Sequence, residues 1–181
     1  MANKGLFYSN KNQTTIQSLI RRPLVDPINT KLLTSNSDRS LIFFRSTNTT
    51  ITVIYELEKP VPSLKEFNIS KICQGNIIEV IPYEGGQFFV ITSTGDIALL
   101  NFDKESFLFF FSTDAIQSIK TQTYNLKNVT SAALSKNKKF LLVNSFAESV
   151  NQIHVFRVLK NGSLKEVSRF QNEDPSKKVK K

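Results

Sequence analysis

Short apolar segments separated by polar turns run through most of the chain. The segments are rich in Ile, Val, Phe and Thr, and several alternate between apolar and polar positions, as in residues 51–55 and 153–158. Helical periodicity is weak almost everywhere. Side chains of a strand alternate with a period of two, and strands are bounded by turn-forming residues, so the pattern predicts an all-β fold.

The same order of strands recurs three times. The letters SLKE occur at residues 63–66 and 163–166, and each copy follows a short apolar strand, a polar loop and an alternating strand. A copy between them lacks SLKE but keeps the order. First strands are expected at 29–35, 76–83 and 129–135, buried second strands at 41–44, 88–91 and 140–143, third strands at 51–55, 97–102 and 153–158, and fourth strands at 64–69, 107–112 and 164–170. Turn residues separate them at Gly85-Gly86, Gly95-Asp96, Asn137-Lys138 and Asn161-Gly162.

Four short strands in about 45–50 residues are typical of one blade of a β-propeller. The pattern therefore predicts three four-stranded antiparallel units, at about 24–69, 76–113 and 129–170, between an N-terminal segment (1–23) and a disordered basic tail (171–181). Closed propellers have about four to eight blades, so three units predict a partial or incomplete propeller. A β-sandwich or barrel stays open as the alternative. The terminal units of an open arc expose apolar faces, so the chain is expected to self-associate or to need a partner.

The third unit, LSKNKKFLLVNSFAESVNQIHVFRVLKNGSLKEV, resembles a blade of the WD40-like and lactonase-like propellers. In those families a hairpin of the form sp-dgkfl-v leads into an i-vf-v strand and then a G-L--v strand. The resemblance covers about residues 24–170 and implies a propeller fold. The chain contains no Trp, so the Asp-His-Ser/Thr-Trp hydrogen-bond network of WD40 blades is missing. Lactonase-like propellers place their catalytic groups around the central channel, and no matching motif can be assigned here.

Candidate catalytic residues are few. A Ser-His-Asp or Cys-His arrangement would have to use the single histidine, His154, for which the sequence locates no Ser or Asp partner. We therefore expect a structural or surface role for His154, and expect His154→Ala to be functionally silent. The single cysteine, Cys73, is expected to be a small buried hydrophobe, and one Cys with one His cannot form a zinc site. The chain is predicted not to be an enzyme and to have no catalytic, cofactor or metal site.

The chain is basic, with a formal net charge of +9 and an isoelectric point of about 9.7. This balance favours acidic partners such as nucleic acid or an acidic protein face. The excess charge is diffuse except at the C-terminal sequence PSKKVKK, where Lys177, Lys178, Lys180 and Lys181 form a candidate acidic-partner or localisation site. A tail that only improves solubility is the alternative.

These observations predict a non-catalytic protein-binding scaffold module of an intracellular assembly, in the nucleus or the cytoplasm. Expected partners are other proteins, including the remaining propeller blades in trans or a second copy of the chain. No membrane partner is expected, because no run reaches the roughly 18 apolar residues of a membrane span and the N-terminus has no apolar signal region. The alternatives are a nucleic-acid-binding module that uses the basic surface, and a lactonase-like enzyme.

Overall fold

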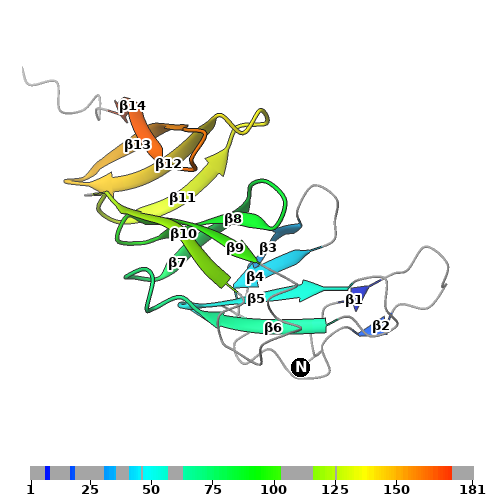
Figure 1. Cartoon of the computed structure of the whole chain (residues 1–181). Helices are drawn as coiled ribbons and strands as arrows, with labels where there is room; N and C mark the ends of the chain where they lie inside the picture. The colour runs from blue at the N-terminus through cyan, green and yellow to red at the C-terminus, as the bar shows by residue number, and fades with distance from the viewer. Residues whose placement is uncertain are drawn as a thin grey trace, which may run out of the picture.

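The computed structural model of the chain describes residues 7–8, 17–18, 31–35, 41–45, 47–56, 63–102, 116–124 and 126–172. Within these residues it contains strands and turns, arranged as three four-stranded sheets and one short two-stranded sheet (Figure 1). The two-stranded sheet pairs β1 (Phe7–Tyr8) with β2 (Gln17–Ser18). Every pairing is antiparallel and joins strands that are consecutive in the chain.

The four-stranded sheets follow one another along the sequence. The first sheet contains β3 (Lys31–Ser35), β4 (Ile42–Arg45), β5 (Thr50–Tyr55) and β6 (Ser63–Asn68). The middle sheet contains β7 (Ile77–Pro82), β8 (Gln87–Thr92), β9 (Asp96–Phe102) and β10 (Ile116–Thr123). The third sheet contains β11 (Val129–Leu134), β12 (Phe140–Ala147), β13 (Val150–Val158) and β14 (Leu164–Asn172).

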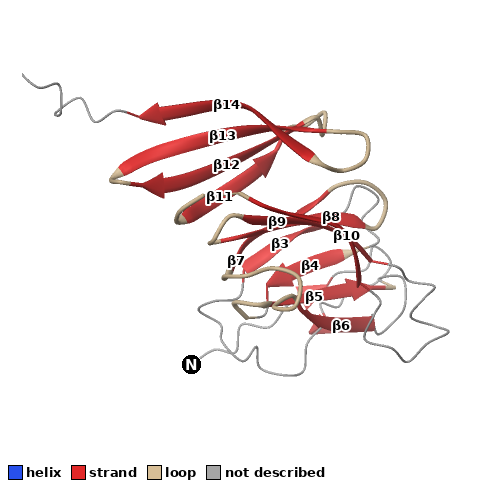
Figure 2. Ribbon diagram, turned by 60° about the vertical axis from the view of Figure 1, so that its left-hand side comes forward, coloured by secondary structure: helices blue, strands red, loops and turns tan. Residues whose placement is uncertain are grey.

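The sheets are arranged as successive blades of a propeller. Their first strands, β3, β7 and β11, lie next to one another, and the other strands of each sheet extend away from this shared inner edge. Figure 2 shows the three sheets in succession, with the third sheet at one end. Within the described residues the sheets do not close into a barrel. The predicted all-β, partial-propeller architecture is therefore confirmed.

The middle sheet is buried on both faces. Phe88 and Val90 of β8 belong to a core shared with the first sheet, whereas Phe89 and Ile91 belong to a core shared with the third sheet. The side chains of β9 alternate in the same way, and Leu100 belongs to the core shared with the first sheet. This double burial explains why β8 and β9 read as continuous apolar runs, since neither face can be polar.

The third sheet is buried on one face only. Along β12, Leu141 and Val143 are fully buried against the middle sheet, whereas Leu142 is 38% exposed. The expectation that all three second strands are buried therefore holds for β8 and is wrong for β12. No described sheet covers the other face of the third sheet, so every second side chain of β12 faces solvent.

One predicted strand lies elsewhere in the chain. The fourth strand of the middle unit was expected at residues 107–112, which lie outside the described residues, and the strand that pairs with β9 is β10, at Ile116–Thr123. The strand was expected there because the sequence FLFFF is strongly apolar. In the structure, the more polar segment IQSIKTQT forms the strand that pairs with β9. The basic tail residues Lys177, Lys178, Lys180 and Lys181 also lie outside the described residues.

Among the described residues, no helix has the length and apolar character needed to cross a membrane.

Candidate functional site

Three neighbouring strands of the third sheet bring a serine, a histidine and a glutamate into line. Ser145 Oγ on β12 lies 3.0 Å from His154 Nε2 on β13, and His154 Nδ1 lies 3.0 Å from Glu166 Oε1 on β14. An ionised Glu166 can only accept, so Nδ1–H donates to it, and Nε2 then accepts from the Ser145 hydroxyl. With Arg169, these residues form what we call the polar relay. It has the order of groups found in a Ser-His-acid triad.

The polar relay was missed by sequence reasoning, which found no partner for His154. Its members are nine and twelve residues apart and meet only through the cross-strand register. In that register, Val143 of β12 pairs with His154 of β13, and Phe156 of β13 pairs with Glu166 of β14. Side chains that share a face on adjacent strands come within contact distance. The sequence contained one signal of this contact: Ser145 and His154 lie at core-facing positions of two strands that were expected to pair.

Burial gives the polar relay a structural role. Ser145 and His154 are each 1% exposed, and the His154 ring stacks on Phe156 with centroids 6.3 Å apart. A nucleophile has to be reached by its substrate, and these side chains face the packed contact between the middle and third sheets. Buried polar groups are costly unless they are hydrogen-bonded, and the relay satisfies them.

Arg169 anchors the exposed end of the polar relay. Its Nε donates to Glu166 Oε1 at 3.0 Å and its Nη2 donates to Glu166 Oε2 at 3.3 Å, which is a two-point contact. These bonds hold the pKa of Glu166 below its ordinary value; partial burial opposes the shift, and His154 adds to it. The carboxylate therefore stays ionised and keeps accepting from both neighbours at neutral pH.

Replacing Glu166 by glutamine should make the protein less stable at neutral pH but not in acid. A lowered native pKa stabilises the fold above the ordinary value of 4.5, and this contribution is lost as the pH falls through the native pKa. At pH 7 we expect Glu166→Gln to lower the free energy of unfolding by about 0.5–1 kcal/mol, since the carboxylate is partly exposed. Urea unfolding across a pH series measures the difference. Glu66→Gln, at an exposed position of β6, is the control and should show no pH-dependent loss; a Glu166→Gln deficit that persists in acid would contradict this assignment.

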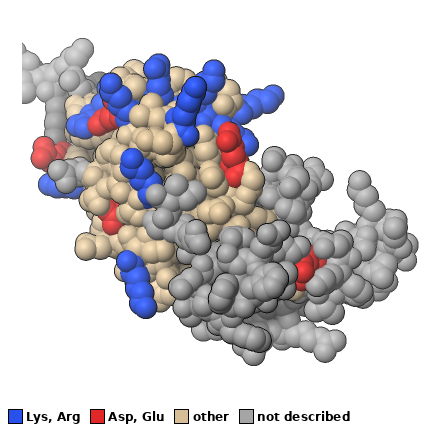
Figure 3. Space-filling model, in the orientation of Figure 1, with Lys and Arg blue, Asp and Glu red and all other residues tan. Residues whose placement is uncertain are grey.

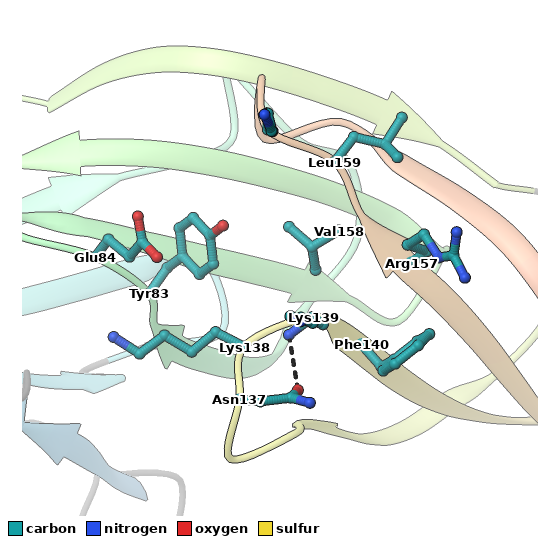
Figure 4. Close-up of a pocket in the computed structure, with 10 residues that line it drawn as sticks. Tyr83, Glu84, Asn137, Lys138, Lys139, Phe140, Arg157, Val158 and Leu159 are labelled. Carbon is teal, nitrogen blue, oxygen red and sulfur yellow. Dashed lines mark hydrogen bonds between the residues drawn. The ribbon is translucent and has the colours of Figure 1, made fainter.

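A second group of polar residues lines an open cleft at the edge of the middle and third sheets. The cleft has a volume of about 730 Å³ and is lined by Tyr83, Glu84, Asn137, Lys138, Lys139, Phe140, Arg157, Val158, Leu159 and Lys160 (Figure 4). These residues come from the β7–β8 turn, the β11–β12 turn with the start of β12, and the end of β13 with the turn that follows. We call it the basic cleft, because four of its lining residues are Lys or Arg. Figure 3 shows Lys and Arg gathered over the part of the molecule that contains the third sheet.

The β11–β12 turn holds two of the lysines in a fixed position. Asn137 Oδ1 accepts from the Lys139 amide at 3.1 Å and from Ser135 Oγ at 2.7 Å, and Lys138 N donates to Ser135 O at 2.8 Å. Lys138 takes a left-handed backbone conformation, with φ of +58°. The predicted Asn137-Lys138 turn is therefore present, and it places Lys138 and Lys139 in the lining of the basic cleft.

The basic cleft combines cations with one acid and one phenol. Among its described lining residues, Glu84 carries the single carboxylate. Burial raises the pKa of the neighbouring Tyr83 hydroxyl, and the charge of Glu84 raises that pKa further, so the phenol remains a hydrogen-bond donor. Arg157 lies over the Phe140 ring, with its guanidinium carbon 5.9 Å from the ring centre. The cleft can therefore bind an anion while offering a carboxylate that accepts a proton.

Cys73 is 3% exposed, and burial, assisted by Asp96, raises the pKa of its thiol to about 12. The thiol is protonated at neutral pH and packs in the core between the first and middle sheets. In the part of the chain that the structure describes, no three His, Cys, Asp or Glu side chains are grouped so that they could hold a metal ion.

No protein-family model matches the chain, and no curated protein matches its sequence. Several solved structures are similar to the chain in fold. A candidate 6-phosphogluconolactonase from Bacteroides uniformis is 18% identical, with a TM-score of 0.56, over 77% of this chain and 41% of that one. The periplasmic gluconolactonase PpgL of Pseudomonas aeruginosa is 13% identical, with a TM-score of 0.58, over 77% of this chain and 39% of that one. The β-propeller domain of Cps50 (Swd1) from Myceliophteria thermophila is 14% identical, with a TM-score of 0.56, over 79% and 44%.

At these identities the likeness shows the fold, and the chain spans less than half the length of each of these structures. The resemblance to WD40-like and lactonase-like propellers that was inferred from the sequence is confirmed, since the matches include lactonases and a WD40 propeller domain. The chain therefore has the architecture of a β-propeller arc.

The prediction of a non-catalytic scaffold module that is not an enzyme is corrected by these comparisons. Two of the three structures carry the names of lactonases, which supports the lactonase-like alternative over the scaffold. The error arose because the absence of a nucleophile motif was taken as the absence of catalysis. Hydrolysis of a lactone needs a base, a water molecule and a stabilised oxyanion, and charged turn residues far apart in the sequence can supply these.

Proposed function

We propose that this chain functions in a lactonase-like propeller and that its basic cleft binds an anionic sugar lactone. The observation that carries the proposal is the convergence of Lys138, Lys139, Arg157 and Lys160 with Glu84 in one cleft of a propeller-type fold. Fixed cations near a site attract and orient an anionic substrate, and a carboxylate beside them can act on water.

The proposed reaction follows from the groups present. Glu84 takes a proton from a water molecule, and the water oxygen bonds to the lactone carbonyl carbon. The ring carbon–oxygen bond then breaks, and the departing ring oxygen takes the proton from Glu84, which gives a hydroxy acid and restores the carboxylate. Negative charge develops on the carbonyl oxygen during the addition. Lys138 lies on the same side of the basic cleft as Glu84 (Figure 4), so it is placed to stabilise that charge.

The other end of the basic cleft is assigned to the acidic group of the substrate. Arg157 lies there, away from Glu84 in Figure 4, and a guanidinium offers the paired donors that suit phosphate. Of the two lactone classes in the names of the similar structures, gluconolactone and its 6-phospho form, the cluster of cations favours the phosphorylated one.

Hydrolysis of 6-phosphogluconolactone and of gluconolactone, followed by acid release at constant pH, tests the proposal. We expect the phosphorylated lactone to be preferred, Arg157→Gln to raise KM for it with little change in kcat, and Glu84→Gln to lower kcat by about 10²-fold or more. Lys127→Gln and Glu66→Gln remove exposed charges outside the basic cleft and should leave both constants unchanged.

A folded chain that hydrolyses neither lactone would overturn the proposed function. Retention of RNA or DNA with a steep decrease in affinity as salt rises would then favour the nucleic-acid-binding alternative, because neutralised phosphates release counterions.

A further inference from the structure

We propose that two copies of this chain associate face to face through the outer face of the third sheet. The outer face is the side of that sheet turned away from the middle sheet. Its side chains, identified from strand alternation and register, are Ser131, Ala133, Phe140, Leu142, Asn144, Phe146, Asn151, Ile153, Val155, Arg157, Lys165, Ser168 and Phe170. The inference does not rest on the proposed lactonase activity, but Phe140 and Arg157 belong to both the outer face and the basic cleft.

Large apolar side chains are exposed on this face. Phe170 is 60% exposed, Ile153 is 43%, Phe146 is 40% and Leu142 is 38%. They adjoin one another, because Ile153 pairs directly with Phe170 across β13 and β14, and Leu142 lies one row away on β12. A contiguous apolar patch of this kind is uncommon on a soluble monomer and marks a contact surface.

The inner face of the same strands shows what covers such a surface. Leu141, Val143 and Phe156 alternate with the exposed residues and are fully buried by the middle sheet. A second sheet stacked at about 10 Å would bury the outer face in the same way. The outer face therefore fits another flat, apolar sheet better than it fits an extended peptide or a helix.

Charged groups of opposite sign lie at the two ends of the third sheet. Arg157 and Lys165 pair directly with each other at the end of the sheet near the basic cleft, and Glu148 is exposed in the β12–β13 turn at the opposite end, beside Phe146. A two-fold axis across the strands places the basic end of one copy over the aromatic and acidic end of the other. Like charges are then kept apart.

The extent of the outer face is sufficient for a dimer. Four strands at about 4.8 Å spacing and about eight residues at 3.3 Å give a face of roughly 500 Å², or roughly 1,000 Å² in total for two copies. That is about the lower limit for a specific interface.

Association should stop at two copies. In the first sheet, at the other end of the arc, both faces of β5 are buried: Ile51 and Val53 are in the core shared with the middle sheet, and Thr52 and Ile54, which alternate with them, are 0% and 2% exposed. At that end of the arc, the described side chains of β5 therefore offer no open face. A single self-complementary face closes as a dimer and does not propagate into a filament.

The oligomeric state of the full chain tests the inference. Size-exclusion chromatography with light scattering over a range of protein concentrations should give a dimer. The double substitution Ile153→Lys and Phe170→Lys should raise the dimer dissociation constant at least about 100-fold, since it would bury unpaired ammonium groups in the interface. Leu159→Lys makes the same chemical change at an exposed apolar residue off the outer face and should leave the dimer intact.

A cross-linking experiment locates the interface without weakening it. Cys73 is the single cysteine of the chain and is buried, so a cysteine introduced on the surface is the reactive one. Val155 lies in a middle row of the outer face, and Val155→Cys should form covalent dimers with a short bis-maleimide, because stacked sheets about 10 Å apart are too distant for a disulfide. Lys127→Cys, at an exposed position before β11, should not.

A chain that is monomeric at every concentration overturns the inference, whether or not it binds a hydrophobic dye. So does a dimer that survives the double substitution, or one that cross-links through position 127 and not through position 155.

Discussion

Replacing Phe156 by alanine should lower the free energy of unfolding by about 3–5 kcal/mol. The ring is 0% exposed, and its centroid lies 4.6 Å from that of Tyr124 in the core that joins the middle and third sheets. Its removal leaves a cavity that neighbouring strands, fixed by their hydrogen bonds, cannot fill. Because a domain is stable by about 5–15 kcal/mol in total, the third sheet should detach or unfold under mild conditions.

Urea unfolding followed by circular dichroism measures this loss, with the slope of the transition showing whether unfolding stays cooperative. Leu159→Ala is the matched control, because Leu159 is 37% exposed and its truncation should cost less than about 1 kcal/mol. Equal losses in the two variants would show that the contact between the middle and third sheets does not stabilise the fold.

Replacing Gly95 by alanine should cost about 2–5 kcal/mol, which combines the penalty for a left-handed residue with overpacking. Gly95 has φ of +88°, and a Cβ there would collide with the Tyr124 carbonyl oxygen and lie 2.9 Å from Leu126 Cβ. The same turn accepts the Tyr124 amide at 3.1 Å, so it ties the β8–β9 hairpin to the segment that leads into the third sheet.

Gly85 separates the two contributions. It also has positive φ, at +53°, but a Cβ there meets nothing within 4 Å. Gly85→Ala should therefore cost only about 1–2 kcal/mol. Thermal unfolding of both variants gives the comparison, and a Gly95→Ala protein as stable as Gly85→Ala would show that the close approach to Tyr124 is relieved without cost.

Most of the strand elements could be predicted from the sequence because the information is local. Apolar bursts such as residues 88–91 have the length and composition of strands, and turns such as Gly95-Asp96 provide the backbone freedom that a tight hairpin needs. The assignment of the fourth strand to residues 107–112 failed, because local hydrophobicity does not reveal which segment completes a sheet. Strand pairing across the sheet decides that, and it selected Ile116–Thr123.

The candidate sites were less predictable, since both depend on register and on contacts between sheets. Ser145 and Glu166 meet His154 only because β12, β13 and β14 pair in one particular alignment. A slip of one residue would turn His154 to the outer face. The basic cleft joins Glu84 of the middle sheet to Lys138 of the third sheet, and no spacing in the sequence expresses that proximity.

The sequence by itself determined the class of the fold, the three-fold repetition of a four-stranded unit and the positions of most of its hairpins, because these follow from periodicity and turn chemistry within a few residues. Only the tertiary structure decided that His154 is bonded within a buried relay, that cations of two sheets share a cleft with Glu84, and that the third sheet presents an apolar outer face while both faces of β5 are buried. The physical reason is that burial and proximity between sheets depend on how separate parts of the chain pack. A strand carries the same alternation of side chains whether or not a neighbouring sheet covers it.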